Sequence, residues 1–295
     1  MIAESLVKAA PLLFCALSFL LAWKAGIVNI GAEGQFLAGA LAAAAVLTRV
    51  HAAGPVLLLA ALPAGVIAGA AWAGAASWLA QRRGVLDVLA TILLNFVAAG
   101  LVSVAAHGFL QERARTFPQS DPVPEAARLA ILVPGTRLHA GILAPAVLAL
   151  VLAWVLRATR AGFRVRAVGA GPRAAEFAGI DVRRVRSAAF LLSGAVAGLG
   201  GAVELAGVSG RLFESFSPGS GYLGLAVAVV GGFSPVGAVA AAWAFGGLNV
   251  LATFLQRRAD VSAASALVVE AGLLLAALAV PRLRSRLRPD RERPA

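Results

Sequence analysis

The sequence contains little charge. Only 14% of its 295 residues are Asp, Glu, Lys or Arg, whereas soluble globular proteins carry about 25%. Hydrophobic residues make up 60% of the chain, and the mean hydropathy is +0.86. These values exclude an ordinary soluble domain and predict an all-α, polytopic membrane protein, because helices are the usual way for a chain to satisfy its backbone in lipid.

Cysteine and lysine are also scarce. The single cysteine, Cys15, lies in an apolar run, so the sequence offers neither a disulfide framework nor a cysteine-based metal cluster. Lys8 and Lys24 are the only lysines among 26 basic residues, and the net charge is +12. Because the arginines gather beside apolar segments, we interpret the positive charge as cytoplasmic loops facing anionic lipid rather than as a nucleic-acid-binding surface.

Sequence motifs of nucleotide hydrolysis and of common catalytic chemistry are missing. The chain has no GxxxxGK[ST] loop, and it has no HExxH, CxxC or GxSxG motif. Its acid, base and metal-ligand residues are isolated, whereas an active site needs a convergent cluster of them. We therefore expect no enzyme activity, no metal site and no cofactor in this chain.

Long apolar runs are abundant, and a helix needs about 20 apolar residues to cross the hydrocarbon core. Glycine and alanine dominate these runs, as in residues 65–74, and small residues let helices pack closely in lipid. We expect one transmembrane domain over residues 1–295, and we expect the run from Pro11 to be a first span rather than a cleavable signal peptide. The predicted spans cover residues 9–23, 36–50, 55–80, 88–107, 141–156, 187–206, 222–232, 236–256 and 263–280.

Basic residues set the expected orientation, because loops rich in Lys and Arg stay in the cytoplasm. Loop 157–186 holds eight arginines and the tail 281–295 holds six, so both are predicted to be cytoplasmic. This assignment places residues 24–35 inside and loop 108–140 outside. We expect the external loop either to meet a partner or to be a solvated loop with one surface helix.

A polar and flexible insert, Gly26–Gln35, separates the first two apolar runs. It carries Asn29, Glu33 and Gln35. An ionisable group at membrane depth costs at least about 2.5 kcal/mol and usually faces a cavity or a partner. The insert is therefore either a helix-breaking anchor at the headgroup level or part of a gate inside the membrane.

A second group of polar residues begins the predicted span 88–107. Asp87, Thr91 and Asn95 are spaced by four residues and so lie on one face of a helix. Such a stripe fits the wall of a pore or substrate path. The alternative is that Asp87 caps the helix N-terminus and that Asn95 only bonds a neighbouring helix.

Two further segments depart from simple spans. The span 222–232 is short, and Gly231–Pro235 (GGFSP) breaks it from the next. This is typical of the interrupted helices along transport paths, but it also fits a short tilted helix. In loop 157–186, Pro172 and Gly179 suit the two ends of a short helix, which either docks on a soluble partner or belongs to a loop that binds lipid headgroups.

Four stretches in a fixed order make a more specific pattern. They are Gly26–Gln35 (GIVNIGAEGQ), Leu86–Val97 (LDVLATILLNFV), Gly162–Ile180 (GFRVRAVGAGPRAAEFAGI) and Gly232–Gly246 (GFSPVGAVAAAWAFG). Together they resemble permease subunits of bacterial ABC importers of the branched-chain amino acid, ribose and nucleoside type. The NIGAEGQ form is most similar to the nucleoside or simple-sugar branch, and the resemblance covers nearly the whole chain.

The resemblance implies a type II ABC importer permease fold with nine to ten transmembrane helices, in the bacterial inner membrane. The predicted orientation leaves the N-terminus outside the cell. Family members usually have one further span before the first one counted here, and such a span would place the N-terminus in the cytoplasm. The implied substrate-pathway residues are Asn29, Glu33, Gln35, Thr91 and Asn95. The implied ATPase-coupling residues are Arg173, Ala174, Ala175, Phe177 and Gly179.

The resemblance also implies partners and a function. The partners are a second permease subunit, often in a heterodimer, a cytoplasmic ATP-binding subunit that uses the ATP, and an external solute-binding protein. The function would be translocation of a nucleoside or simple sugar. The alternatives are a branched-chain amino acid permease of the same superfamily and a stand-alone secondary transporter, which would have inverted repeats and a coupling-ion carboxylate at the membrane midplane.

Overall fold

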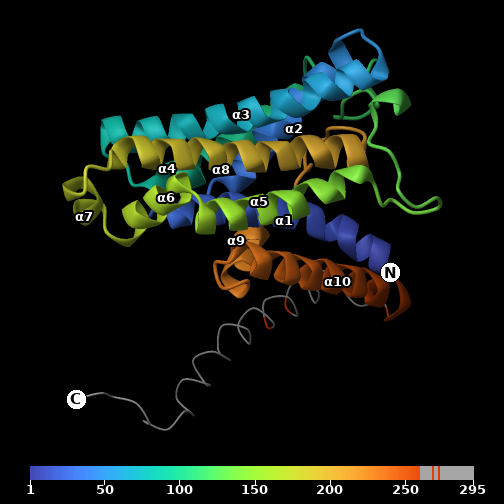
Figure 1. The fold of residues 1–295 in the computed structure, drawn as a ribbon. Coiled ribbons are helices and arrows are strands. Elements are labelled where there is room, and N and C mark those ends of the chain that lie inside the picture. Colours follow the sequence, from blue (N-terminus) through green and yellow to red (C-terminus); the bar gives the residue numbers. More distant parts are fainter. Residues whose placement is uncertain (260–267, 269–271, 273–295) are drawn as a thin grey trace.

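The computed structural model describes residues 1–259, 268 and 272 (Figure 1). Within this part no strand forms, and the loops contain isolated β-bridges. The α-helices are α1 (Ile2–Lys24), α2 (Ala32–Arg49), α3 (Gly54–Arg83), α4 (Asp87–His107), α5 (Leu143–Ala158), α6 (Arg160–Ala170), α7 (Pro172–Phe177), α8 (Val182–Glu204), α9 (Ser220–Val230) and α10 (Pro235–Ala259). Short 3-10 helices η1 (Glu125–Ala127) and η2 (Ala140–Ile142) and a π-helical turn η3 (Leu205–Ser209) join them.

The predicted spans coincide with helices wherever the structure describes them. Eight of the nine match α1 to α5 and α8 to α10. Among the described residues, six segments are long and apolar enough to cross a membrane, namely α1, α3, α4, α5 with η2, α8 with η3, and α10. The predicted span 263–280 and the basic tail 281–295 lie outside the described residues, so the count of nine to ten spans stays a prediction.

Helices α2, α3 and α8 pack closely because glycines face one another where they meet. A Cβ added at Gly198 would lie 2.2 Å from the carbonyl oxygen of Gly65, and one at Gly69 would lie 2.2 Å from that of Gly194. A Cβ at Gly39 of α2 would meet the carbonyl oxygen of Gly198 at 2.2 Å. The backbones therefore touch without intervening side chains, as expected for small residues between membrane helices.

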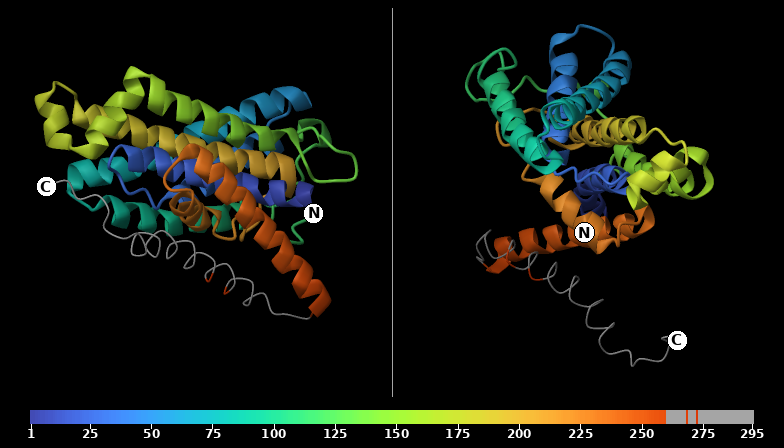
Figure 2. Two further views of the ribbon diagram at one scale, coloured as in Figure 1. Left: turned by 60° about the horizontal axis from the view of Figure 1, so that its bottom comes forward. Right: turned by 90° about the vertical axis from the view of Figure 1, so that its left-hand side faces the viewer.

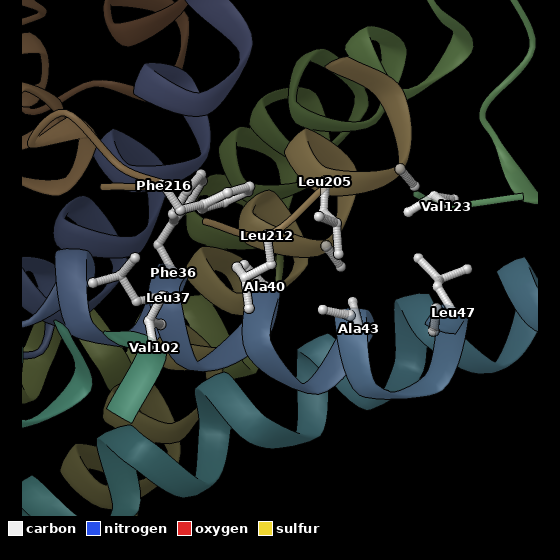
Figure 3. Close-up of a cluster of buried hydrophobic side chains, with 14 of the residues drawn as sticks. Phe36, Leu37, Ala40, Ala43, Leu47, Val102, Val123, Leu205, Leu212 and Phe216 are labelled. Atoms are coloured by element: carbon white, nitrogen blue, oxygen red, sulfur yellow. The ribbon is translucent and has the colours of Figure 1, made fainter. Parts of the chain in front are cut away.

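One apolar face of α2 lies at the centre of a large buried cluster (Figure 3). Phe36, Ala40, Ala43 and Leu47 follow one another at spacings of four, three and four residues, which places them on one side of the helix. The other side chains of this cluster come from α3, α4, α8, η3 and the loops, and include Val102, Val123, Leu205, Leu212 and Phe216. Helix α2 is thus enclosed by protein rather than by lipid.

Helix α1 runs through the bundle, and α10 crosses it obliquely at one edge (Figure 2). A Cβ at Gly246 of α10 would lie 2.2 Å from the carbonyl oxygen of Ser5, so these two backbones also touch. The window of α1 that is apolar enough to span a membrane is 78% buried inside the protein. The first span is therefore a central element of the fold.

The two ends of the bundle differ in character. We call the end with α6 and α7 the basic end, and the end with the N-terminus and loop 108–140 the loop end (Figure 1). Loop 108–140 is held against residues 205–219, since the Ser120 N–H donates to the Leu212 carbonyl at 2.7 Å. An Arg211–Glu112 ion pair at 2.8 Å joins the same segments. The loop is thus a packed cap, although most of its residues are exposed, and its contact with a partner stays a prediction.

Loop 157–186 is more helical than predicted. Helix α6 fills its first part, and α8 begins at Val182 rather than at residue 187. Helix α7 begins at Pro172 as predicted but ends at Phe177, and Gly179 follows with a φ of +79°, which favours glycine. Helix α6 is short and too polar to be counted as a membrane span, although its few apolar residues favour one side.

Candidate transport site and coupling surface

The chain turns back into the bundle between α1 and α2. Gly26, with a φ of +74°, makes the turn. Asn29 then reaches Ser193 of α8, whose hydroxyl oxygen lies 3.2 Å from that of Ser18 in α1. Ser18 precedes the end of α1 by six residues, which is about 9 Å of helix. Asn29 therefore lies inside the bundle, near the level of Ser18 rather than at the end of α1.

Asn29 and Gln35 form a buried amide network. Asn29 Nδ2 donates to Gln35 Oε1 at 3.0 Å and to Ser193 Oγ at 2.6 Å. Asn29 Oδ1 accepts from Gln35 Nε2 at 3.2 Å and from the Gly31 N–H at 2.8 Å. Because buried polar groups need partners, these bonds explain how two amides with at most 1% exposure persist among apolar helices.

Asn95 joins α4 to the start of α2 and to α9. Its Oδ1 accepts from the Gly34 N–H at 2.8 Å, and its Nδ2 donates to the Ile30 carbonyl at 3.0 Å and to Tyr222 Oη at 3.2 Å. The contact needs glycine at position 34, since a Cβ there would lie 2.8 Å from Asn95 Oδ1. One side chain therefore holds three elements together.

Glu33 lies where the N-termini of two helices meet. It belongs to the first turn of α2, and its Oε2 accepts the N–H of Gly221, in the first turn of α9, at 2.6 Å. The Ser217 side chain and the Gly219 backbone also hydrogen bond to this carboxylate. Helix N-termini offer free N–H groups and partial positive charge, so this arrangement suits a carboxylate that is only 6% exposed.

Helix α9 is a half-length helix with irregular backbone on both sides. Its 11 residues span about 16 Å, roughly half of the hydrocarbon core. The segment 210–219 leads into it, with the ring of Phe216 6.1 Å from that of Phe36. After α9 the chain turns, and Phe233 stacks on Trp23 at 4.8 Å. The predicted break at Gly231–Pro235 is present, and a second break precedes the helix.

The stripe on α4 divides into three different environments. Thr91 Oγ1 donates within its own helix to the Asp87 carbonyl at 2.8 Å. The Asp87 side chain does not cap α4, so that interpretation is wrong, and its carboxylate lies 3.8 Å from Arg186 of α8. Asn95 is the member of the stripe that bonds to the chain around the amide network, at Ile30 and Gly34.

We call the set of buried contacts at the start of α2 the polar junction. Its polar groups bond to one another and to the backbone, so the junction is closed in this conformation. Ser18, Ser193 and Tyr222 were not predicted from the sequence. Serines in apolar runs are common, but the single tyrosine of the chain was a usable signal. The predicted pathway residues all belong to or border the junction and are at most 6% exposed: Asn29, Glu33, Gln35, Thr91 and Asn95.

Helix α7 projects from the basic end (Figure 1). Its Phe177 ring is 94% exposed, and Arg173 and Ala174 are exposed beside it. Ala175 faces the protein and is buried, while Gly179 is exposed. A large apolar side chain held this far into solvent is typical of a protein-contact anchor.

Helices α6 and α8 connect α7 to the turn that precedes the junction. Arg186 Nη2 donates to the Gly26 carbonyl at 2.9 Å. A Cβ at Gly169 of α6 would lie 2.2 Å from the Lys24 carbonyl oxygen, so α6 rests directly on the end of α1. A displacement of α6 and α8 would therefore act directly on the residues before Asn29.

The sequence matches a known protein family over most of its length. Residues 1–278 match the family described as the branched-chain amino acid transport system / permease component. The chain belongs to this permease family. It is a multi-pass membrane protein, and the resemblance to ABC importer permeases inferred from its four motifs is confirmed.

Several curated relatives of this permease are similar over most of the chain. The glucose ABC transporter permease protein TsgB13 of Haloferax volcanii is 39% identical over 283 residues, which cover 92% of this chain and 74% of the relative. The guanosine ABC transporter permease protein NupP of Bacillus subtilis is 31% identical, covering 84% and 72%. The nucleoside ABC transporter permease protein NupB of Lactococcus lactis is 31% identical, covering 83% and 70%. These relatives are transport permeases rather than enzymes, and no solved structure matches the permease.

Proposed function

We propose that this permease moves a nucleoside or a simple sugar across the membrane as one subunit of an ABC importer. The names of the relatives, which specify glucose, guanosine and nucleosides, support this proposal. The chemistry of the junction also supports it. Neutral amides and hydroxyls around one tyrosine suit a polyhydroxy ligand with a planar base better than an inorganic ion.

The polar junction would act as a gate. Its bonds run between α2, α4, α8 and α9, so a relative movement of these helices would break several of them together. The freed amides of Asn29, Gln35 and Asn95 would then be available to ligand hydroxyl groups, with Glu33 and Thr91 beside them. A ligand would favour the open state by replacing bonds that the closed state makes internally.

ATP would be used by a partner rather than by this chain. A cytoplasmic ATP-binding subunit would dock on α7, with Phe177 as the apolar anchor, Arg173 and Ala174 at its side, and Ala175 and Gly179 shaping the helix and its end. A second permease subunit, often a different chain, would complete the pathway. An external solute-binding protein would dock on the packed cap at the loop end.

The proposal is tested by ATP hydrolysis in a reconstituted complex. The permease is purified with the ATP-binding subunit and the second permease, placed in proteoliposomes, and supplied with the solute-binding protein and guanosine, glucose or leucine. We expect guanosine or glucose to stimulate hydrolysis. Stimulation by leucine alone would favour a branched-chain amino acid permease, and uptake that persists without the ATP-binding subunit would favour a stand-alone transporter.

A further inference from the structure

A basic cavity of about 770 Å³ lies at the basic end, between the start of α6 and the start of α8. One carboxylate lines it, that of Asp181, and this group already lies 3.7 Å from Arg184. Phe163, which is 59% exposed, adds an apolar surface. The remaining charged residues in its lining are arginines: Arg157, Arg160, Arg164 and Arg166.

These four arginines, which we call the arginine cluster, share the cavity with one carboxylate among the described residues, that of Asp181, which pairs with Arg184 instead. None of them makes an ion pair or a side-chain hydrogen bond to a described residue, and all four are exposed. Like charges gathered around one cavity repel one another. An anion bound between them would remove this repulsion, and guanidinium groups match the geometry of a phosphate.

An apolar stripe on α5 leads into the same cavity. Leu143, Val147, Leu150 and Trp154 are spaced by four, three and four residues, so they share one face of the helix. Each is more than half exposed, with values of 57%, 55%, 65% and 62%. Arg157 continues the stripe three residues later and lines the cavity. From Leu143 to Arg157 the stripe is about 21 Å long, whereas the hydrocarbon layer of one leaflet is about 15 Å thick.

We propose that the cavity holds the phosphate headgroup of an anionic phospholipid whose acyl chains lie along the stripe of α5. The charged and apolar parts form one continuous surface, and a phospholipid has both chemistries in the same order. A soluble acidic protein could meet the arginine cluster but could not cover a stripe within a membrane span. Basic pockets beside span ends bind anionic headgroups in this way.

Such a lipid would join α6 to α8. These are the two helices that flank α7 in the chain, and α8 also carries Arg186, which bonds to Gly26. The headgroup would brace the supports of α7 at the membrane surface. This inference concerns a lipid site and does not depend on which solute the permease moves.

The test measures phospholipid retained by the purified full-length permease. The protein is incubated in detergent with phosphatidylglycerol or phosphatidylcholine of identical acyl chains, passed through gel filtration, and analysed for bound lipid by mass spectrometry. We expect phosphatidylglycerol to be preferred. The double variant Arg160→Gln/Arg164→Gln should weaken its binding about 25-fold, roughly fivefold for each lost charge.

The control variant is Arg82→Gln/Arg83→Gln, which removes the same charge from the end of α3, outside the cavity. It should keep the preference for phosphatidylglycerol. Equal retention of the two lipids by the wild type, or equal losses in both double variants, would overturn the proposal. Displacement of the lipid by millimolar glycerol phosphate would assign the cavity to a free phosphate compound instead.

Two further measurements keep the test decisive. Thermal unfolding without added lipid shows whether the cluster variant folds; if it does not, the wild type is assayed at 0.15 M and 1 M salt. Salt should abolish the preference, because the screening length falls from about 8 to 3 Å, and an unchanged preference would contradict the proposal. A different result would assign the cavity to the ATP-binding subunit. In that case Arg160→Gln/Arg164→Gln would still bind phosphatidylglycerol but would no longer co-purify with that subunit.

Discussion

Asn29 makes four side-chain hydrogen bonds inside an apolar bundle, and these bonds satisfy polar groups of Gln35, Ser193 and Gly31. The sequence shows that Asn29, Gln35 and Asn95 are unusual for their polarity in apolar surroundings. It does not show that they are partners of Ser193 and Tyr222, which lie more than 120 residues away from the residues they bond. Such pairings follow from how the helices pack, and a local pattern cannot contain them.

Replacement of Asn29 by alanine should destabilise the permease. Gln35 and Ser193 would lose a buried partner, and each orphaned polar group costs about 1–3 kcal/mol. The measurement is thermal unfolding of the purified protein in detergent. The control is Asn249→Ala in α10, an asparagine that makes no side-chain hydrogen bond within the described part of the chain. Equal melting temperatures for the two variants would contradict the role given to the network.

His139 should make the loop end sensitive to acid. Its ring is 1% exposed, neither ring nitrogen has a hydrogen-bond partner among the described residues, and burial lowers the pKa of the ring. The folded state therefore keeps His139 neutral, while the unfolded chain takes up a proton below about pH 6.5. Stability is fully present above that pH and falls as the pH drops towards the folded pKa, by up to about 1.4 kcal/mol per pH unit.

The measurement is thermal unfolding at pH 7.5 and pH 5 for the wild type and for His139→Phe. The variant should lose less stability on acidification than the wild type. Glu112 does not interfere in this window, because the hydrogen bond from Gln119, with Arg211 nearby, lowers the pKa of its carboxyl below the ordinary 4.5. An identical pH response in the two proteins would show that the His139 ring does not control it.

At the scale of elements, apolar composition was sufficient to place the helices of the bundle, and it failed where other forces act. Helix α6 was missed because its arginines are exposed and line the cavity, which makes the helix too polar to resemble a membrane span. The irregular segment before α9 lies between the predicted spans 187–206 and 222–232, and its polar sequence did not indicate that Phe216 packs on Phe36 of α2. The frequency of Gly and Ala predicted that helices would pack closely. It did not predict which glycines of α2, α3 and α8 meet.

Gly198→Val should disrupt the packing of α8 against α2 and α3. A Cβ at this position would already lie 2.2 Å from the Gly65 carbonyl, so the backbones must separate. Overpacking of this kind costs about 1–3 kcal/mol or more, measured as a lower melting temperature. Gly100→Val in α4 is the control, because a Cβ there has nothing within 4 Å. Similar losses in both variants would mean that the glycine contact is not what matters.

Phe177→Ala should weaken docking of the ATP-binding subunit without unfolding the permease. The ring is 94% exposed, so its removal leaves no cavity in the fold. Removal of a central apolar anchor costs about 2 kcal/mol of binding, or roughly 30-fold in affinity. The measurement is the affinity of the purified subunits for each other. Phe109→Ala, which removes a 65% exposed ring at the loop end, is the control and should bind normally.

At the scale of the whole molecule, the basic end and the junction form one mechanical path. Helix α7 rests on α6 and α8, Arg186 of α8 holds the Gly26 carbonyl, and the turn after Gly26 leads to Asn29 and Glu33. Motif order along the sequence was enough to identify the family and the candidate residues. The closed state of the junction, and its direct link to the basic end, became visible only when α4, α8 and α9 were placed around the start of α2.

The most direct test of this account is solute uptake by proteoliposomes that contain the full complex with Glu33→Gln or Glu33→Leu. Glu33 accepts a bond from the first turn of α9 and places a negative charge between two helix N-termini. Gln removes the charge and Leu removes both the charge and the bond, so both variants should lose most ATP-driven uptake of guanosine or glucose. They should still assemble with the ATP-binding subunit in normal amounts, and Glu214→Gln, at the exposed loop end, should transport normally. Normal uptake by both Glu33 variants, with normal assembly, would contradict the claim that the polar junction is the gate.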